Sequence, residues 1–116
     1  MSRMILKDVS EVPSEIPRMD GVKDATMRLL FGKPDSMPHF YMREFLVEPG
    51  GHTPLHSHDY EHEVYILGGT GEVECGGVVK PVAEGKAIYI PANEPHQFRN
   101  NSSEALRFLC LVPAQP

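Results

Sequence analysis

The sequence predicts an all-β domain built as an antiparallel sandwich or barrel, and three observations support this. Short segments with strand-like alternation recur through the second half of the chain, turns rich in Gly, Pro and Asn separate them, and no window has a helical period. At 116 residues the chain is long enough for one domain with a hydrophobic core. The strands expected in this half are 63–67, 72–75, 78–82, 87–90, 97–99 and 105–112.

Within this one domain we expect residues 1–38 to form an N-terminal arm with edge strands. We expect residues 39–116 to form the barrel. Prolines in the arm exclude a long helix, so we expect short strands at 4–6 and 25–31. A strong strand at 40–47, closed by the turn at 48–51, is apolar on both faces and should be covered on both. The arm or a second subunit would supply the outer cover, and this is the indication of a homodimer.

Composition narrows the partners and the compartment. The net charge of −5 and the absence of a Lys- or Arg-rich stretch argue against nucleic acid and anionic membrane as partners. Cys75 and Cys110 form no CxxC pair, so we expect reduced thiols. The apolar run at 4–6 is ended by Lys7 and Asp8, far short of a signal peptide or a membrane span. These observations favour a soluble, cytoplasmic protein.

Four histidines are candidates for one mononuclear metal centre. His56 and His58 are two residues apart, so on an extended segment both side chains leave the same face. His62 begins an alternating run and shares its face with Val64, and His96 follows in a second stretch punctuated by Gly and Pro. Neutral imidazoles in such a group are ligands for a divalent transition metal. The remaining two, His39 and His52, we expect at the surface and at a loop or rim, respectively.

The last predicted strand indicates which face is the interior. Over 105–112, Arg107 occupies one face, and the opposite face carries Phe108 and Cys110. Because an unpaired buried arginine is costly, the face without it should be the lumen. We therefore expect Phe98, Phe108 and Cys110 to line a substrate pocket beside the histidines. The alternative, equally weighted, is that Phe108 is ordinary core and Cys110 a small buried hydrophobe.

The spacing of these residues resembles the two motifs of the cupins. In the first motif, Gly50 is followed by five residues and His56-Ser57-His58; in the second, Gly85 precedes Pro91-Ala92-Asn93 by five residues, and His96 and Asn100 follow. Asn93 stands where the family has glycine, and asparagine is the residue that best tolerates positive φ in its place. The turn should therefore survive the replacement.

The glutamate position of the first motif is the main departure. With Glu63 in that place the gap to Gly69 is one residue short, whereas with His62 both gaps fit the motif. Strand parity agrees, because Glu63 points away from the face that carries His62. We therefore assign His62 as a metal ligand, and Glu61 and Glu63 become candidates for orienting the ligand imidazoles from outside the ligand set.

Over nearly its whole length the chain is similar to small single-domain cupins that bind manganese through four histidines. This resemblance implies a double-stranded β-helix, or jelly roll, usually dimeric, with the metal in the mouth of the barrel. It implies one divalent metal per chain, with manganese as the first expectation and iron, nickel, copper or zinc as alternatives. The implied ligands are His56, His58, His62 and His96.

The ligand set favours a metal-dependent reaction on a small molecule. Four neutral imidazoles leave the full +2 charge of the ion, and a six-coordinate ion would keep two positions for substrate and dioxygen. Our leading hypothesis is a dioxygenase-like oxidoreductase acting on a small, partly apolar or enolisable compound, with no catalytic side chain assigned. The alternatives are a non-redox isomerase, cyclase or lyase, as the resemblance to four-histidine polyketide cyclases implies, and a small-molecule binding protein without turnover.

Overall fold

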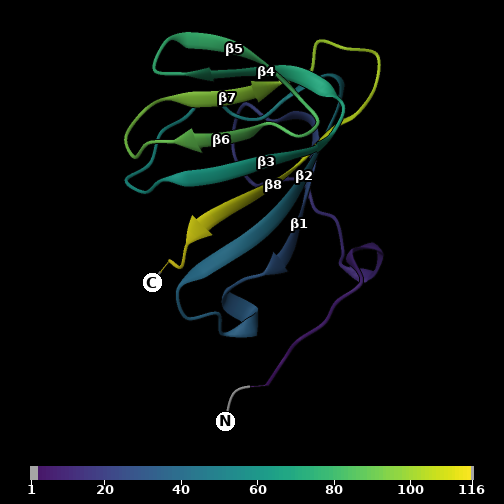
Figure 1. Ribbon diagram of the computed structural model, residues 1–116, viewed down its shortest axis with the longest axis vertical. Coiled ribbons are helices and arrows are strands. Elements are labelled where there is room, and N and C mark those ends of the chain that lie inside the picture. Colours follow the sequence, from purple (N-terminus) through teal and green to yellow (C-terminus); the bar gives the residue numbers. More distant parts are fainter. Residues whose placement is uncertain (1–2, 116) are drawn as a thin grey trace.

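A computed structural model describes residues 3–115, and its strands form one curled antiparallel sheet (Figure 1). The strands are β1 (Lys23–Phe31), β2 (Phe40–His52), β3 (His62–Gly68), β4 (Thr70–Cys75), β5 (Val78–Ala83), β6 (Ala87–Ile90), β7 (His96–Arg99) and β8 (Leu106–Pro113). Within the described residues the helical elements are two short 3₁₀ turns, η1 (Val9–Glu11) and η2 (Lys33–Asp35), and neither is long enough to cross a membrane. The predicted all-β class is confirmed.

The strand order is that of a jelly roll, because most neighbours in the sheet are distant in sequence. Hydrogen-bonded neighbours follow the order β5-β4-β7-β2-β8-β3-β6, and β1 adds to the free side of β2. The C-terminal strand β8 thus lies between β2 and β3, where it closes the domain. The sheet curls so that the inner faces of its strands enclose one core.

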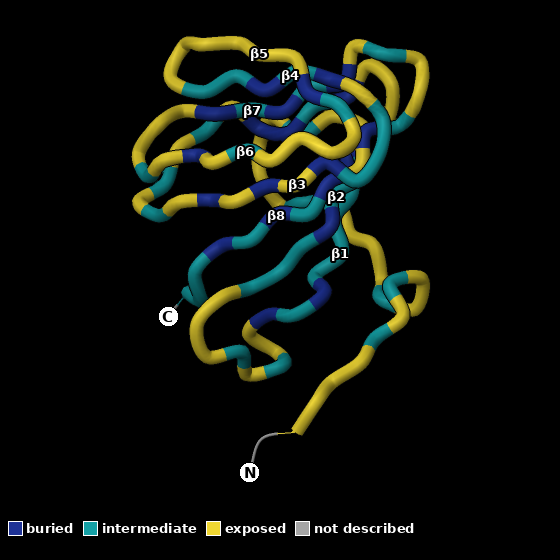
Figure 2. The backbone as a smooth tube through the Cα atoms, in the orientation of Figure 1, coloured by how far each residue is buried: buried dark blue, intermediate teal, exposed yellow. Residues whose placement is uncertain are grey.

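The core confirms the interior face that we predicted for the last strand. Along β8, Leu106, Phe108 and Cys110 are buried, and Arg107 is exposed, which gives the alternation visible in Figure 2. The ring of Phe108 stacks between Phe45 and Phe98, with centroid distances of 5.3 Å and 4.6 Å. Three strands therefore meet at one aromatic stack just below the histidines.

Two expectations for the first half of the chain are wrong. Residues 4–6 form no strand, and Met4 and Leu6 are about nine-tenths exposed, since this part of the arm pairs with no other strand (Figure 2). Strand β2 does not end at Val47 but continues through the predicted turn to His52. Gly50 has φ +81°, which lets β2 bend and pass from its β8 partner at Leu106 to its β7 partner at Arg99.

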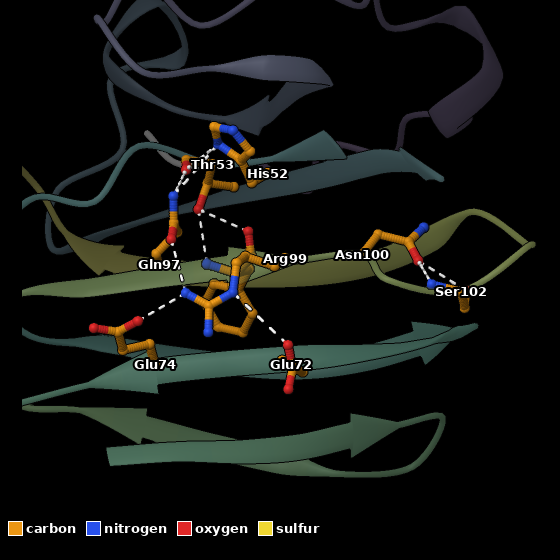
Figure 3. Close-up of polar contacts among 9 residues, drawn as sticks. His52, Thr53, Glu72, Glu74, Gln97, Arg99, Asn100 and Ser102 are labelled. Carbon is orange, nitrogen blue, oxygen red and sulfur yellow. Dashed lines mark hydrogen bonds and ion pairs between the residues drawn. The ribbon is translucent and has the colours of Figure 1, made fainter. Parts of the chain in front are cut away.

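A buried asparagine supports this change of partner. Asn100 is 2% exposed, and its amide donates to the carbonyls of Val47 (2.9 Å) and Glu104 (2.7 Å). Its Oδ1 accepts from the backbone N–H and the hydroxyl of Ser102 (Figure 3). The final residue of the second motif thus joins β2 to the loop before β8. Asn93 has φ +68°, so the motif turn does survive without glycine, as predicted.

Candidate metal centre

The loops and strand starts at the open end of the sheet position the four histidines. His62 opens β3 and His96 opens β7. His56 is not on a regular strand, but it forms a two-bond bridge with His96, with N···O distances of 3.2 Å and 2.9 Å. His58 lies in the loop that follows, where its carbonyl accepts from the N–H of Asn93 (2.7 Å). The turn of the second motif therefore holds a histidine of the first.

The four imidazoles surround one point. Ring nitrogens of His56, His58 and His96 lie within 4.8 Å of one another, which suits a shared ion. His62 joins them through its Nε2, which faces Nε2 of His58, and its ring centroid is 5.0 Å from that of His96. All four residues that we assigned as ligands are thus brought together.

Three of the imidazoles are oriented by backbone carbonyls. Nδ1 of His56 lies 3.1 Å from the carbonyl of Pro54, Nδ1 of His58 lies 2.9 Å from that of Tyr60, and Nδ1 of His96 lies 2.9 Å from that of Glu94. A carbonyl oxygen accepts only, so in each contact Nδ1 carries the proton and donates it. Nε2 then keeps its lone pair, and this is the pattern of metal-ligating histidines.

His62 has a different partner. Its Nδ1 lies 2.8 Å from Sγ of Cys110, and Nη2 of Arg43 donates to the same sulfur at 3.1 Å. Arg43 also lies 3.3 Å from Nδ1 of His62, but both groups are donors when Nε2 is the free nitrogen, so the sulfur is their common acceptor. The sulfur of Cys110 thus accepts the Nδ1–H of His62, as backbone carbonyls accept the Nδ1–H of the other three histidines.

The electrostatics of the site favour the neutral form of His58, His62 and His96, which is the form that binds metal. Burial, with a smaller contribution from the adjacent Arg43 charge, lowers the pKa of His62 to about 2. Burial is also the main cause that lowers the pKa values of His58 and His96. A donor set of four imidazole nitrogens fits a divalent transition metal, and it does not distinguish manganese from iron, nickel, copper or zinc.

A cavity of about 360 Å³ opens beside the histidines, which is within the size range of small-molecule sites. Phe98, Phe108 and Cys110, the residues that we expected beside the histidines, all line this cavity. Sequence reasoning missed its other walls, which are Pro17, Arg18, Met19, Met27, Arg43, Phe45, Thr53, Pro54, Ser57 and Tyr60. For Arg43 a signal existed, because it shares strand parity with Phe45, which packs on the lumen residue Phe108. No pattern marked the residues from the arm.

The suggested role of the glutamates in orienting the ligands is wrong. Glu61 and Glu63 are exposed, and Glu63 lies on the outer face of β3, opposite Tyr89 of β6 and Leu111 of β8. Backbone carbonyls and Cys110 orient the imidazoles instead. His39 is exposed, as expected. His52 contacts the carbonyl of Thr53 and the side-chain amide of Gln97 (Figure 3), and it is not among the residues that line the cavity.

Comparison with known proteins agrees with the fold. The profile of the family described as "Cupin domain" matches residues 43–112, which is more than half of the chain. The chain belongs to the cupin family. The predicted resemblance and jelly-roll fold are thereby confirmed.

Two relatives among characterised sequences illustrate the range of cupin functions. The chain is 45% identical over 74 residues to the 1-methylthio-D-xylulose 5-phosphate methylsulfurylase of Rhodospirillum rubrum, a match that covers 64% of this chain and 47% of that protein. It is 30% identical over 114 residues to an oxalate-binding protein of Thermotoga maritima, covering 94% and 93% of the two chains. This cupin thus spans about half the length of the first relative and nearly all of the second.

Among solved structures, the polyketide cyclase RemF of Streptomyces resistomycificus has a TM-score of 0.91 and 37% identity, covering 97% of this chain and 81% of that one. A predicted oxalate decarboxylase of Thermotoga maritima has a TM-score of 0.85 and 27% identity, covering 96% and 100%. Cupins with quite different activities therefore share this barrel.

Proposed function

We propose that this cupin is a metal-dependent enzyme acting on a small organic molecule, with His56, His58, His62 and His96 holding one divalent ion. The observation that carries this proposal is the convergence of four oriented imidazoles at the wall of a cavity of about 360 Å³. A divalent ion held there would polarise a carbonyl or enolate oxygen of the substrate. The stacked rings of Phe45, Phe98 and Phe108 would contact its apolar part and keep water away.

A non-redox reaction, such as cyclisation or isomerisation, is the class that we favour. The 37% identity to a polyketide cyclase over 97% of the chain supports it, and so does a ligand set without a carboxylate to stabilise a trivalent metal. The sulfur of Cys110 also lies 2.8 Å from Nδ1 of His62, so reactive oxygen species formed at the ion would be able to oxidise this thiol. Tyr60 lines the cavity, and its ring stacks on His58 at 4.0 Å, so it would help to hold that ligand in place.

The dioxygenase-like reaction of our leading sequence hypothesis becomes the second candidate. It is favoured by the number of histidines, since four ligands leave two positions on a six-coordinate ion for substrate and dioxygen. The two candidates differ in whether the ion changes oxidation state.

Metal analysis and electron paramagnetic resonance distinguish them. The protein is purified without chelator and without a tag, its metal content is measured, and spectra are taken before and after exposure to oxygen with candidate diketone or polyketide-like substrates. We expect about one ion per chain and conversion of substrate by the zinc-loaded protein with no dependence on oxygen. Turnover only with a redox-active ion and oxygen would establish the second candidate, and absence of metal binding would refute the proposal.

We further propose that this cupin is a homodimer. The support is the arm, where Met4, Leu6 and Ile16 are 90%, 91% and 71% exposed, together with Phe40 at 63% at the start of β2. A second chain that covered the arm would remove these apolar side chains from water. Light scattering after size-exclusion chromatography should give twice the monomer mass, and a monomer at micromolar concentration would contradict it.

A further inference from the structure

The cavity beside the histidines carries positive charge in an acidic protein. The chain has a net charge of −5, yet the described residues that line this cavity include two arginines, Arg43 and Arg18, and no aspartate or glutamate. The four imidazoles next to them offer no compensating negative charge, because an imidazole side chain is either neutral or cationic. A ligand that enters this cavity therefore meets a cationic wall before any contribution from a metal.

Arg43 is held inside this cavity without an acidic partner. Within residues 3–115 it forms no ion pair, and its Nε is buried and without a hydrogen-bond partner. Its contacts are Cys110 and His62 through Nη2, and the face of Phe45, whose ring centroid is 5.1 Å from Cζ. An unpaired guanidinium with a free buried donor is costly unless an anion completes it.

Arg28 is also partly buried, but unlike Arg43 it has an acidic partner. Arg28 on β1 also has a buried Nε without a partner, but its guanidinium lies 3.5 Å from the carboxylate of Glu44. Arg99 likewise pairs with Glu74 at 2.7 Å, as Figure 3 shows. Arg28 and Arg99 thus each have an acidic side chain beside the guanidinium, whereas Arg43 has none among the described residues.

We propose that the substrate is a small organic anion whose carboxylate or phosphate group binds Arg43, with Arg18 of the arm facing the same anion from the cavity mouth. This inference rests on the proposed function, because it places the anionic group beside the ion that the histidines hold. The apolar part of the molecule contacts the rings of Phe98 and Phe108. Arg43 is suited to this task because its planar fork pairs with two oxygens at once.

Benzoate and benzamide test the inference, because they share size and shape and differ in charge. Isothermal titration calorimetry is performed on zinc-loaded protein, after its metal content has been measured, and on protein without added metal. We expect benzoate to bind at least roughly tenfold more tightly than benzamide, and Arg43→Met to remove that preference while zinc affinity stays within about threefold. Arg18→Met should weaken benzoate binding by a smaller factor, since Arg18 is exposed.

Arg107→Met is the matched control. Arg107 is exposed on the outer face of β8, so the substitution removes the same charge from the chain without touching the cavity. It should leave the preference for benzoate unchanged within about twofold, since solvent and salt screen the charge of an exposed side chain outside the cavity from the bound ligand. Phenylphosphonate, titrated in parallel, shows whether the cavity favours a phosphate-like or a carboxylate group.

The outcomes separate this inference from the proposed function. Failure of the wild-type protein to bind zinc would refute the metal-dependent function, while the titration of metal-free protein would still test whether benzoate binding requires Arg43. Equal affinities for benzoate and benzamide, or benzoate binding unaffected by Arg43→Met, would overturn the inference. So would loss of zinc from Arg43→Met, because Arg43 would then serve only to support His62 through Cys110.

Discussion

Replacement of Cys110 should weaken metal binding although the thiol is not a ligand. In Cys110→Ala the Nδ1–H of His62 loses its hydrogen-bond acceptor, the sulfur 2.8 Å away. Because His62 is only 6% exposed, water does not readily replace that acceptor. Loss of such an orienting partner typically lowers metal affinity by about tenfold to a hundredfold. At 1.36 kcal/mol for each tenfold, this corresponds to about 1.4–2.7 kcal/mol of binding free energy.

The same substitution removes one buried sulfur atom and should cost about 1 kcal/mol of folding free energy. Competition with a chromophoric chelator at pH 7.5 measures the zinc affinity, and urea unfolding of the metal-free protein measures the stability. Cys110→Ser keeps an acceptor with a shorter reach, so we expect it to recover part of the lost affinity. Zinc binding by Cys110→Ala as tight as that of the wild type would refute this role of the sulfur.

Val112→Ala provides the control for packing alone. Val112 lies on the same strand and the same face as Cys110 and is 5% exposed, but it does not line the cavity. Its truncation should reduce stability by about 1–3 kcal/mol and leave zinc affinity within about twofold. An equal loss of affinity in both variants would show that general loosening of β8, rather than the contact to His62, is responsible.

Three further predictions concern the ligand set, pH and the turns. His62→Ala should lower metal affinity at least roughly tenfold and Glu63→Ala little, because only His62 faces the cluster; equal effects in the chelator competition would contradict the assignment. The metal-free protein should lose stability as the pH falls below about 6.5, because the unfolded chain binds a proton there while His62, with a pKa of about 2, stays neutral when folded. This contribution is at most about 1.4 kcal/mol per pH unit for that residue, and urea midpoints that do not change between pH 7.5 and 5.5 would refute it. Gly69→Ala should cost at least about 3 kcal/mol, since its φ is +84° and a Cβ would lie 2.2 Å from the carbonyl oxygen of Ala105. Gly85→Ala, with φ +89° and open space around it, should cost only about 1–2 kcal/mol, and similar urea midpoints for the two variants would contradict the clash.

Local rules predicted most of the barrel. Alternation and turn residues located the strands from β3 onward, because each is short, amphipathic and bounded by a turn whose chemistry is visible in the sequence. Parity alone placed His62 inward and Glu63 outward, and the structure has both as expected. The tolerance of asparagine for positive φ likewise explained Asn93 in advance. These features depend on residues close together in the chain.

The features that sequence reasoning missed depend on contacts between distant segments. The extension of β2 to His52 requires a second partner, β7, whose position is decided by the whole sheet. The arm contributes Arg18 to the cavity through its path over the barrel, and no local pattern encodes that path. The orienting carbonyls of Pro54, Tyr60 and Glu94 are backbone atoms, so the identities of the side chains do not reveal them.

Strand register is what joins the metal centre to the proposed anion site. Arg43 of β2 lies directly opposite Cys110 of β8, and Cys110 lies opposite Val64 of β3, which shares its inward face with His62. A slip of β8 by one residue would turn the sulfur outward and leave both His62 and Arg43 without their shared acceptor. The sulfur therefore holds His62 and Arg43 at a fixed separation, although 67 residues separate Arg43 from Cys110 in the chain. Because the arginine depends on this contact only through Nη2, its buried Nε stays free for a substrate oxygen.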